Sequence, residues 1–227
     1  MLAPTHALDS YEARALREDL VHGLVAQGDL ESPSVIEAMR IVPRHIFVPE
    51  APLIAAYANR PVHIGEGQTI SQPAVVAVMT EALELTGHER VLEIGCGSGY
   101  QAAVLSILAR EVYSVERIEA LAQSAARHLA DLGCANVRIR IGDGWLGWPE
   151  EAPFDRIVVT AAPNVLPVAL LDQLGEGGIL VAPIGEQGHF TQSLVRLRKI
   201  GGAFEEEDLG AVQFVEMKHG EKRKPFA

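Results

Sequence analysis

The sequence predicts an α/β protein built on a Rossmann-like, doubly wound and mostly parallel sheet. Three observations support this fold class. From residue 89 onward, buried strand candidates alternate with helix candidates, as in a parallel sheet covered on both faces. A glycine-rich turn joins the first of these strands to the helix that follows it. Two strand candidates near the C-terminus have no helix between them, so we expect an antiparallel edge strand.

Length and composition describe one globular domain. The chain has 227 residues, of which 48% are hydrophobic and 22% are charged. We expect a single domain over 1–227, with a helical extension over 1–88 and an α/β core over 89–227. No apolar run approaches the roughly 20 residues that span a bilayer, and the N-terminus lacks the pattern of a signal peptide. We therefore expect a cytoplasmic protein with no membrane partner.

The net charge disfavours nucleic acid as a partner, and the cysteine spacing disfavours a metal site. The formal net charge is -11, which disfavours a surface that neutralises many phosphates, so we expect no nucleic-acid partner. Cys96 and Cys134 have neither a metal-binding spacing nor a disulfide framework. The sequence therefore predicts no metal site and agrees with a reducing compartment.

Start signals predict three helices in the extension. Asp9 and Glu12 form a weak capping box ahead of leucines at helical spacing. Ser32, followed by a proline, begins a second helix that ends near Ile41. Pro73 stands in the first turn of a third helix over 72–85.

Two segments between these helices are predicted to be non-helical. The stretch "VPRHIFVP" (42–49) should be extended, because each proline biases the residue before it away from helix. The stretch "IGEGQTIS" (64–71) contains two glycines and is predicted to be a loop.

The core is predicted to alternate strands with helices. We expect strands over 90–95, 111–116, 136–144, 154–162 and 177–185. We expect helices over 98–109, along the apolar stripe from Ile118 to Leu132, and over 167–174. Two last strands, over 190–200 and 209–218, should pair as an antiparallel edge, with the acidic "EEED" (205–208) in the connection between them.

The segment "VLEIGCGSGY" (91–100) is the strongest functional signal. Gly95, Gly97 and Gly99 directly follow a buried strand and precede a helix, which lets a ligand approach the backbone. A dinucleotide site needs glycine at the sixth position, which is Tyr100 here. Glu93 would repel a pyrophosphate but would suit an ammonium group. These features favour S-adenosylmethionine over NAD as the ligand.

Acidic residues end the next two strands. Glu116 lies about 20 positions after the first glycine, the spacing of an acid that binds ribose hydroxyls. The Asp143 carboxylate could accept a hydrogen bond from the adenine amino group, although Asp-Gly is also an ordinary turn. We expect their neighbours Arg117, Gly142 and Gly144 to belong to the same cofactor site.

These motifs resemble the class I S-adenosylmethionine-dependent methyltransferases, and the opening segments are more specific. From about residue 30 to 215, "VPRHIFVP", "IGEGQTISQP" and "LGEGGILVAPIG" resemble the protein-L-isoaspartate O-methyltransferase family. The resemblance implies a seven-stranded sheet, S-adenosylmethionine as methyl donor, and isoaspartyl-containing peptides and proteins as substrates. It implies that Gln68, Thr69 and Ile70 contact the donor and that Ser71 is the active-site residue.

Some features of the sequence leave alternatives. Ser71 precedes the helix at Pro73, so it could simply cap that helix. His63 and the segment "FVEMKHG" (214–220) depart from the family's usual pattern. The rival functions are an NAD-dependent oxidoreductase, a binding module without catalysis, and a methyltransferase for RNA or a small metabolite. The glycine spacing disfavours the first, the intact "GQTIS" disfavours the second and third, and the acidic charge disfavours RNA.

Overall fold

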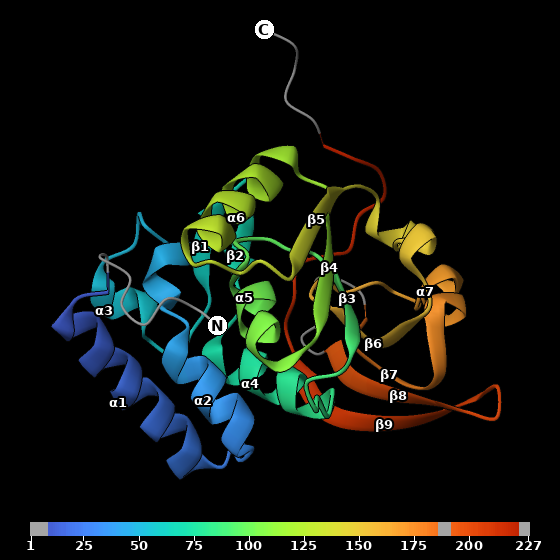
Figure 1. Cartoon of the computed structure of the whole chain (residues 1–227), viewed down its shortest axis with the longest axis horizontal. Coiled ribbons are helices and arrows are strands. Elements are labelled where there is room, and N and C mark those ends of the chain that lie inside the picture. Colours follow the sequence, from blue (N-terminus) through green and yellow to red (C-terminus); the bar gives the residue numbers. More distant parts are fainter. Residues whose placement is uncertain (1–8, 186–191, 223–227) are drawn as a thin grey trace, which may run out of the picture.

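The computed structural model describes residues 9–185 and 192–222. Its centre is a seven-stranded sheet with the order β5-β4-β3-β6-β7-β8-β9 (Figure 1). Five neighbouring strands are parallel, and β8 and β9 add an antiparallel edge. The strands are β3 (Arg90–Ile94), β4 (Glu111–Glu116), β5 (Val137–Ile141), β6 (Phe154–Val159), β7 (Leu174–Ile184), β8 (Gln192–Ile200) and β9 (Ala203–Val212). The predicted fold class is confirmed.

The strand order reverses beside β3. The chain runs outward from β3 through β4 to β5, and then returns to place β6 on the other side of β3. A doubly wound sheet has an open crevice at such a reversal, outside the carboxyl ends of the strands. The topology therefore places a binding site at the ends of β3, β4 and β6.

Seven α-helices and three short 3-10 turns accompany the sheet in the described residues. They are α1 (Tyr11–Gln27), α2 (Pro33–Ile41), α3 (Leu53–Ala56), α4 (Pro73–Ala82), α5 (Tyr100–Leu108), α6 (Glu119–Asp131), α7 (Val168–Gln173), η1 (Arg44–Phe47), η2 (Gly144–Leu146) and η3 (Pro149–Glu151). Figure 1 shows α1, α2 and α3 together on one side of the molecule and α7 on the other side of the sheet. Among the described residues, no helix has the length and apolarity to cross a bilayer.

Successive strand residues enter two different hydrophobic cores. In β3, Val91 packs into one core and Leu92 into the other. The same alternation occurs in β6, where Val158 and Val159 belong to different cores. The first core also contains the buried residues of α1 and α2, so the N-terminal extension covers one face of the sheet.

The prediction that 42–49 is extended is wrong. Val42 and Val48, which precede the two prolines, do have extended or bridging backbone angles, as proline requires. Four of the five residues between the prolines instead form η1, in which the side chains of Arg44 and Phe47 are buried. Proline restricts only the residue before it, and tertiary burial determines the rest of the segment.

The loop predicted over 64–71 is a β-hairpin. Strands β1 (Val62–Gly65) and β2 (Gln68–Ile70) pair antiparallel. The two residues between them, Glu66 and Gly67, have φ angles of +55° and +72°. Two consecutive positive φ angles are characteristic of the tight turn that joins hairpin strands. The glycines here therefore form a turn rather than an irregular loop.

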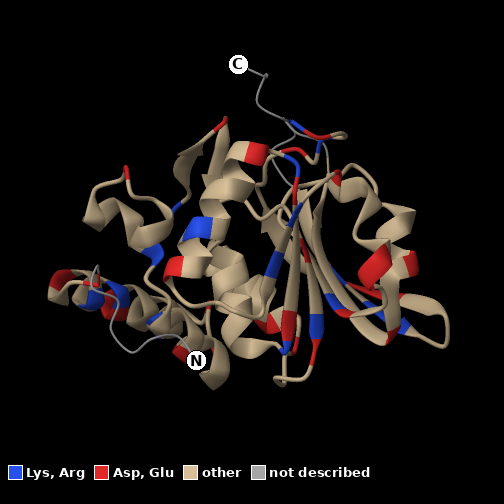
Figure 2. Ribbon diagram, turned by 45° about the horizontal axis from the view of Figure 1, so that its top comes forward, with Lys and Arg blue, Asp and Glu red and all other residues tan. Residues whose placement is uncertain are grey.

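The acidic run 205–208 lies within β9, not between two strands. Arginines on β8 stand opposite two of its glutamates, with Arg198 facing Glu205 and Arg196 facing Glu207. Such cross-strand pairs stabilise a sheet, and a charged edge strand resists pairing with other chains. Acidic and basic segments accordingly lie side by side at this edge (Figure 2). The strand predicted over 190–200 begins, in the described residues, at Gln192, and positions 190 and 191 lie outside them.

Smaller corrections concern the strand and helix ends. The strand predicted over 209–218 ends at Val212. Ser10, rather than Asp9, caps α1 by accepting a hydrogen bond from the backbone N–H of Ala13. Asp9 instead forms an ion pair with Arg17.

Candidate active site

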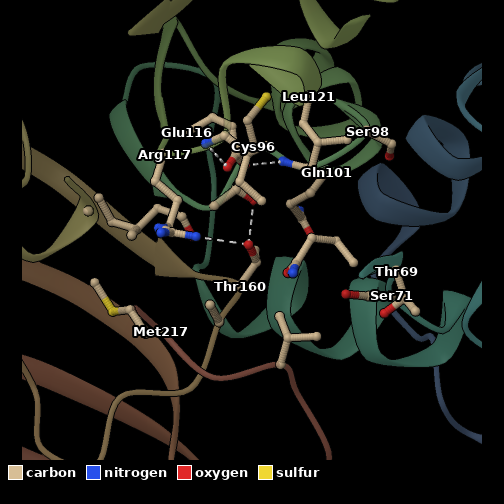
Figure 3. A pocket seen from close by; sticks show the side chains of 18 of the residues that line it. Thr69, Ser71, Cys96, Ser98, Gln101, Glu116, Arg117, Leu121, Thr160 and Met217 are labelled. Atoms are coloured by element: carbon tan, nitrogen blue, oxygen red, sulfur yellow. Dashed lines mark hydrogen bonds between the residues drawn. The ribbon is translucent and has the colours of Figure 1, made fainter. Parts of the chain in front are cut away.

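A cavity opens at the reversal of strand order, as the topology requires. Its volume, including space open to solvent, is about 870 Å³. The predicted site residues that line it are Gln68, Thr69, Ile70, Ser71, Gly95, Gly97, Glu116, Arg117 and Gly144. The other four, Glu93, Gly99, Gly142 and Asp143, do not line it. Figure 3 shows Glu116 and Arg117 on one side of the cavity and Thr69 and Ser71 on the other.

The glycine loop turns sharply at the end of β3. Gly95, Gly97 and Gly99 have φ angles of +95°, +55° and +92°, which side chains rarely adopt. A Cβ atom on Gly95 would lie 2.5 Å from the Thr160 hydroxyl oxygen, so the close approach of β6 also requires glycine there. Thr160 donates a 2.5 Å hydrogen bond to the Gly95 carbonyl and fixes the loop against β6.

Glu116 connects the glycine loop to the beginning of α6. Its two carboxylate oxygens accept 2.8 Å hydrogen bonds from the backbone N–H groups of Gly97 and Ile118. The side chain is almost fully buried, and this burial raises the pKa of its carboxyl group. Each carboxylate oxygen has a second lone pair, so Glu116 can still accept hydrogen bonds from a ligand in the cavity.

Glu93 is fully buried in β3 and accepts a hydrogen bond from the Ser114 hydroxyl. Its other carboxylate oxygen has no hydrogen-bond partner among the described residues. Burial raises the pKa of the Glu93 carboxyl group to about 8, so at neutral pH this group mostly carries a proton. Its predicted contact with an ammonium group stays a prediction, since the cavity wall here is formed by the following residues, Ile94 to Cys96.

Asp143 holds the C-terminal segment in place. Its two oxygens accept hydrogen bonds of 2.9 Å from the Trp145 backbone N–H and 2.8 Å from the Gly220 backbone N–H. Arg117 contacts the same segment, because its Nε donates a 3.0 Å hydrogen bond to the Gly220 carbonyl. The proposed contact between Asp143 and adenine stays a prediction, and the cavity is lined at this point by Gly144.

Residues 215–218 complete the cavity wall. None of them was among the site residues predicted from the sequence. Further along this segment, Lys222 forms a 2.6 Å ion pair with Glu66 at the hairpin turn. Segments more than 150 residues apart thus meet at the hairpin turn. The departure of "FVEMKHG" from the family pattern was the only sequence signal here. Thr160 and Tyr100 also line the cavity and were not among the predicted site residues.

A second cavity adjoins the first. Its volume, again including open space, is about 930 Å³, and it lies between the hairpin, the beginning of α4 and residues 211–215. The two cavities share four lining residues, which are Thr69, Ser71, Thr160 and Val215. Ser71 therefore lies where the two cavities meet.

The structure does not support a capping role for Ser71. The residue at the N-cap of α4 is Gln72, and it makes no side-chain capping hydrogen bond. Among the described residues, the Ser71 hydroxyl has no hydrogen-bond partner, although its carbonyl accepts a 2.7 Å hydrogen bond from Arg44. The hydroxyl is therefore available to a ligand. Over the same residues, no cluster of His, Cys, Asp or Glu could hold a metal ion.

A glycine loop at the reversal of a doubly wound sheet, an acid that ends the next strand, and a reversed edge strand define the class I methyltransferase fold. The family model of protein-L-isoaspartate(D-aspartate) O-methyltransferase matches residues 15–222, and the chain belongs to this family.

Relatives and solved structures agree with this assignment. The chain is 54% identical to the protein-L-isoaspartate O-methyltransferase of Halorhodospira halophila, over 90% of this chain and 92% of the relative. It is 50% identical to that of Dictyoglomus thermophilum, over 92% and 94% of the two chains. A solved protein-L-isoaspartate O-methyltransferase superposes with a TM-score of 0.80 at 32% identity, over 88% of this chain and 65% of that one. A Plasmodium falciparum structure named for a beta-aspartate methyltransferase, in complex with S-adenosyl-L-homocysteine, superposes with a TM-score of 0.79 at 27% identity, over 89% and 98%.

Proposed function

We propose that the protein transfers the methyl group of S-adenosylmethionine to the free α-carboxylate of L-isoaspartyl residues in damaged peptides and proteins. The observation that carries this proposal is the junction of two cavities at Thr69, Ser71, Thr160 and Val215. The glycine loop and Glu116 line only the first cavity, so this cavity takes the donor and the second takes the peptide. Family membership and the Plasmodium falciparum structure in complex with S-adenosyl-L-homocysteine support the same donor.

On the donor side, the residues provide hydrogen-bond acceptors and apolar surface. Glu116 is placed to accept hydrogen bonds from ribose hydroxyls through its remaining lone pairs. Ile118 and Leu121 line the same part of the cavity and provide an apolar surface for an aromatic base. The donor itself supplies the chemistry, a methyl group on a sulfonium that is already an excellent leaving group.

On the acceptor side, no residue has to generate a nucleophile. An isoaspartyl α-carboxylate has a pKa near ~3.5, so it is ionised at neutral pH. The hydroxyls of Thr69 and Ser71 can hydrogen-bond this carboxylate and hold one oxygen in line with the methyl carbon and sulfur. Alignment of this kind accounts for ~7–11 kcal/mol of a barrier, which explains why the site needs neither a catalytic triad nor a metal ion.

The product explains how methylation leads to repair. The carbonyl carbon of a methyl ester is more electrophilic than that of a carboxylate, and methoxide is a better leaving group than oxide, so the nitrogen of the following peptide bond attacks the ester carbonyl. Methanol leaves and a succinimide ring forms. Water opens this ring at either carbonyl, and one of the two openings restores a normal aspartyl residue. These later steps need no residue of the enzyme.

Methyl transfer to matched peptides tests the proposal. Labelled S-adenosylmethionine is incubated with a peptide that contains one isoaspartate and with its aspartyl twin. An ordinary aspartate places its carboxylate elsewhere relative to the backbone, and a misplacement of about 1 Å can cost ~100-fold in rate. We expect a strong preference for the isoaspartyl peptide and little dependence on salt, because a chain of net charge -11 does not attract its substrates by charge. Comparable labelling of both peptides, or labelling of RNA alone, would refute the proposal.

A cytoplasmic location belongs to the same proposal. Cys96 and Cys134 are both free and buried, as expected for a protein of a reducing compartment. The acidic net charge further supports protein substrates over nucleic acids.

A further inference from the structure

Arg44 is a buried cation without an acidic partner. Its side chain is 1% exposed, and no carboxylate among the described residues forms an ion pair with it. Nε donates a 2.9 Å hydrogen bond to the Ala56 carbonyl, and Nη2 donates a 2.7 Å hydrogen bond to the Ser71 carbonyl. Nη1 is buried and has no partner in the described part of the chain.

Such a position is unfavourable for stability. Burial of a charge without a counter-charge is costly, and burial lowers the pKa of the Arg44 guanidinium to about 10, so the group is still a cation at neutral pH. The same fold treats another buried arginine differently. Arg17 is 6% exposed, and Asp9 accepts two 2.9 Å hydrogen bonds from its guanidinium. The buried Arg17 thus has a counter-charge, whereas Arg44 has none among the described residues.

The position of Arg44 relates it to the site rather than to the core. Its guanidinium lies 4.9 Å from the centre of the Tyr100 ring, and Tyr100 lines the donor cavity as the first residue of α5. Its hydrogen bond to Ser71 fixes the peptide unit immediately before α4, at the junction of the two cavities. One side chain therefore connects the wall of the donor cavity to the residue that faces the acceptor.

We propose that Arg44 is a positioning residue for the acceptor: it fixes the Ser71 peptide unit, and its uncompensated charge raises the potential where the anionic acceptor carboxylate binds. This inference rests on the proposed function. The carboxylate is the only anion that the reaction brings to this side of the junction, and an unpaired buried cation nearby favours it in a low-dielectric site. Arg44 acts through Ser71 and is not itself placed in contact with the reacting atoms.

The experiment compares Arg44→Met and Arg44→Lys with the matched control Arg17→Met. Three quantities are measured for each protein: the melting temperature, the dissociation constant of S-adenosylhomocysteine by calorimetry, and KM and kcat for an isoaspartyl peptide. We expect Arg44→Met to raise the peptide KM about 10- to 100-fold, because the variant removes a buried cation that attracts the carboxylate in a low-dielectric site, while affinity for S-adenosylhomocysteine is retained. Arg44→Lys should restore part of the peptide affinity. Arg17→Met should lower the melting temperature and leave the peptide KM unchanged.

A second readout separates charge from packing. The peptide whose α-carboxylate is replaced by a carboxamide is used as a competitive inhibitor. The wild-type protein should prefer the carboxylate form, and Arg44→Met should lose much of this preference. If Arg44→Met does not fold, the same two measurements on Arg44→Gln decide, because glutamine also removes the charge but can still donate hydrogen bonds. Arg44→Lys retains the charge, so it should retain more of the carboxylate preference than either uncharged variant.

The outcomes distinguish the two proposals. A wild-type protein that does not methylate the isoaspartyl peptide refutes the proposed function. An active wild-type protein whose Arg44 variants keep both the peptide KM and the carboxylate preference overturns only the role of Arg44.

Discussion

Replacement of Glu116 by glutamine should separate donor binding from folding. The two Glu116 oxygens each accept a 2.8 Å hydrogen bond from a backbone N–H group, one from Gly97 in the glycine loop and one from Ile118 ahead of α6. A glutamine side chain has the same shape, but its NH₂ group cannot accept a hydrogen bond. Whichever way the amide is turned, one of the two N–H groups faces another donor.

The magnitude follows from these contacts. A hydrogen bond to a charged group contributes about 1.5–3 kcal/mol. The two backbone hydrogen bonds exist without the donor, so their weakening lowers the melting temperature and not the affinity. Towards a bound ribose, the carboxylate offers charged acceptors and glutamine offers one neutral acceptor, so the dissociation constant of S-adenosylhomocysteine should rise about 10- to 100-fold.

Calorimetric titration with S-adenosylhomocysteine measures this loss, and circular dichroism verifies the fold. Glu111→Gln is the matched control, because Glu111 begins the same strand, is partly exposed and pairs with Arg90 and Arg138 away from the cavity. The control should bind with wild-type affinity. Unchanged affinity in a folded Glu116→Gln protein would remove Glu116 from the donor site.

Three further predictions use the same assays. Ser71→Ala should lower turnover on the isoaspartyl peptide and leave donor affinity unchanged. The melting temperature should also stay unchanged, because Gln72 and not Ser71 occupies the N-cap of α4. Normal turnover would contradict the proposed role of Ser71. Gly95→Ala should abolish donor binding and destabilise the fold by at least about 1–2 kcal/mol. The reasons are that φ at Gly95 is +95° and that the new Cβ would lie 2.5 Å from the Thr160 hydroxyl oxygen. A variant that still binds the donor would show that the loop can shift. The Glu93 carboxyl has a pKa of about 8 in the folded state against an ordinary value of 4.5. Between these two pH values the folded state holds a proton that the unfolded state has released. The free energy of unfolding should therefore fall as pH rises through this range, by a few kcal/mol in total. Urea unfolding at several pH values should show that Glu93→Gln lacks this slope, and parallel profiles would contradict the buried, protonated state.

The sheet could be predicted because its signals are local. The parallel strands β3, β4 and β6 are short, largely apolar runs, and each is followed by a helix, α5, α6 and α7 respectively. The antiparallel edge was predictable for the same reason, since only glycines separate β8 from β9. The acidic run was misplaced because charge alone suggests a solvent-exposed connection. Its pairing with Arg196 and Arg198 depends on cross-strand register, which a single strand does not reveal.

Only part of the candidate site could be predicted, because only part of it is encoded in local sequence patterns. The glycines and Glu116 are found by their spacing along one βαβ unit, and they do line the cavity or hold its loop. The contacts of Glu93 and Asp143 with a ligand depend on where each side chain points; both hydrogen-bond protein groups, and their contacts with the donor stay predictions. Thr160 and the segment 215–218 reach the cavity from distant parts of the chain, so no local pattern identifies them.

In the proposed reaction, methyl transfer converts a sulfonium cation and a carboxylate anion into a neutral thioether and a neutral ester. Arg44 lies beside Ser71, where the carboxylate is proposed to bind, and no acidic partner among the described residues compensates its charge. The acceptor side therefore attracts the carboxylate but not the ester, and this arrangement favours product release as well as alignment. It also explains why a site with so few titratable groups can work: the reactants bring the charges, and the protein has only to place them in line.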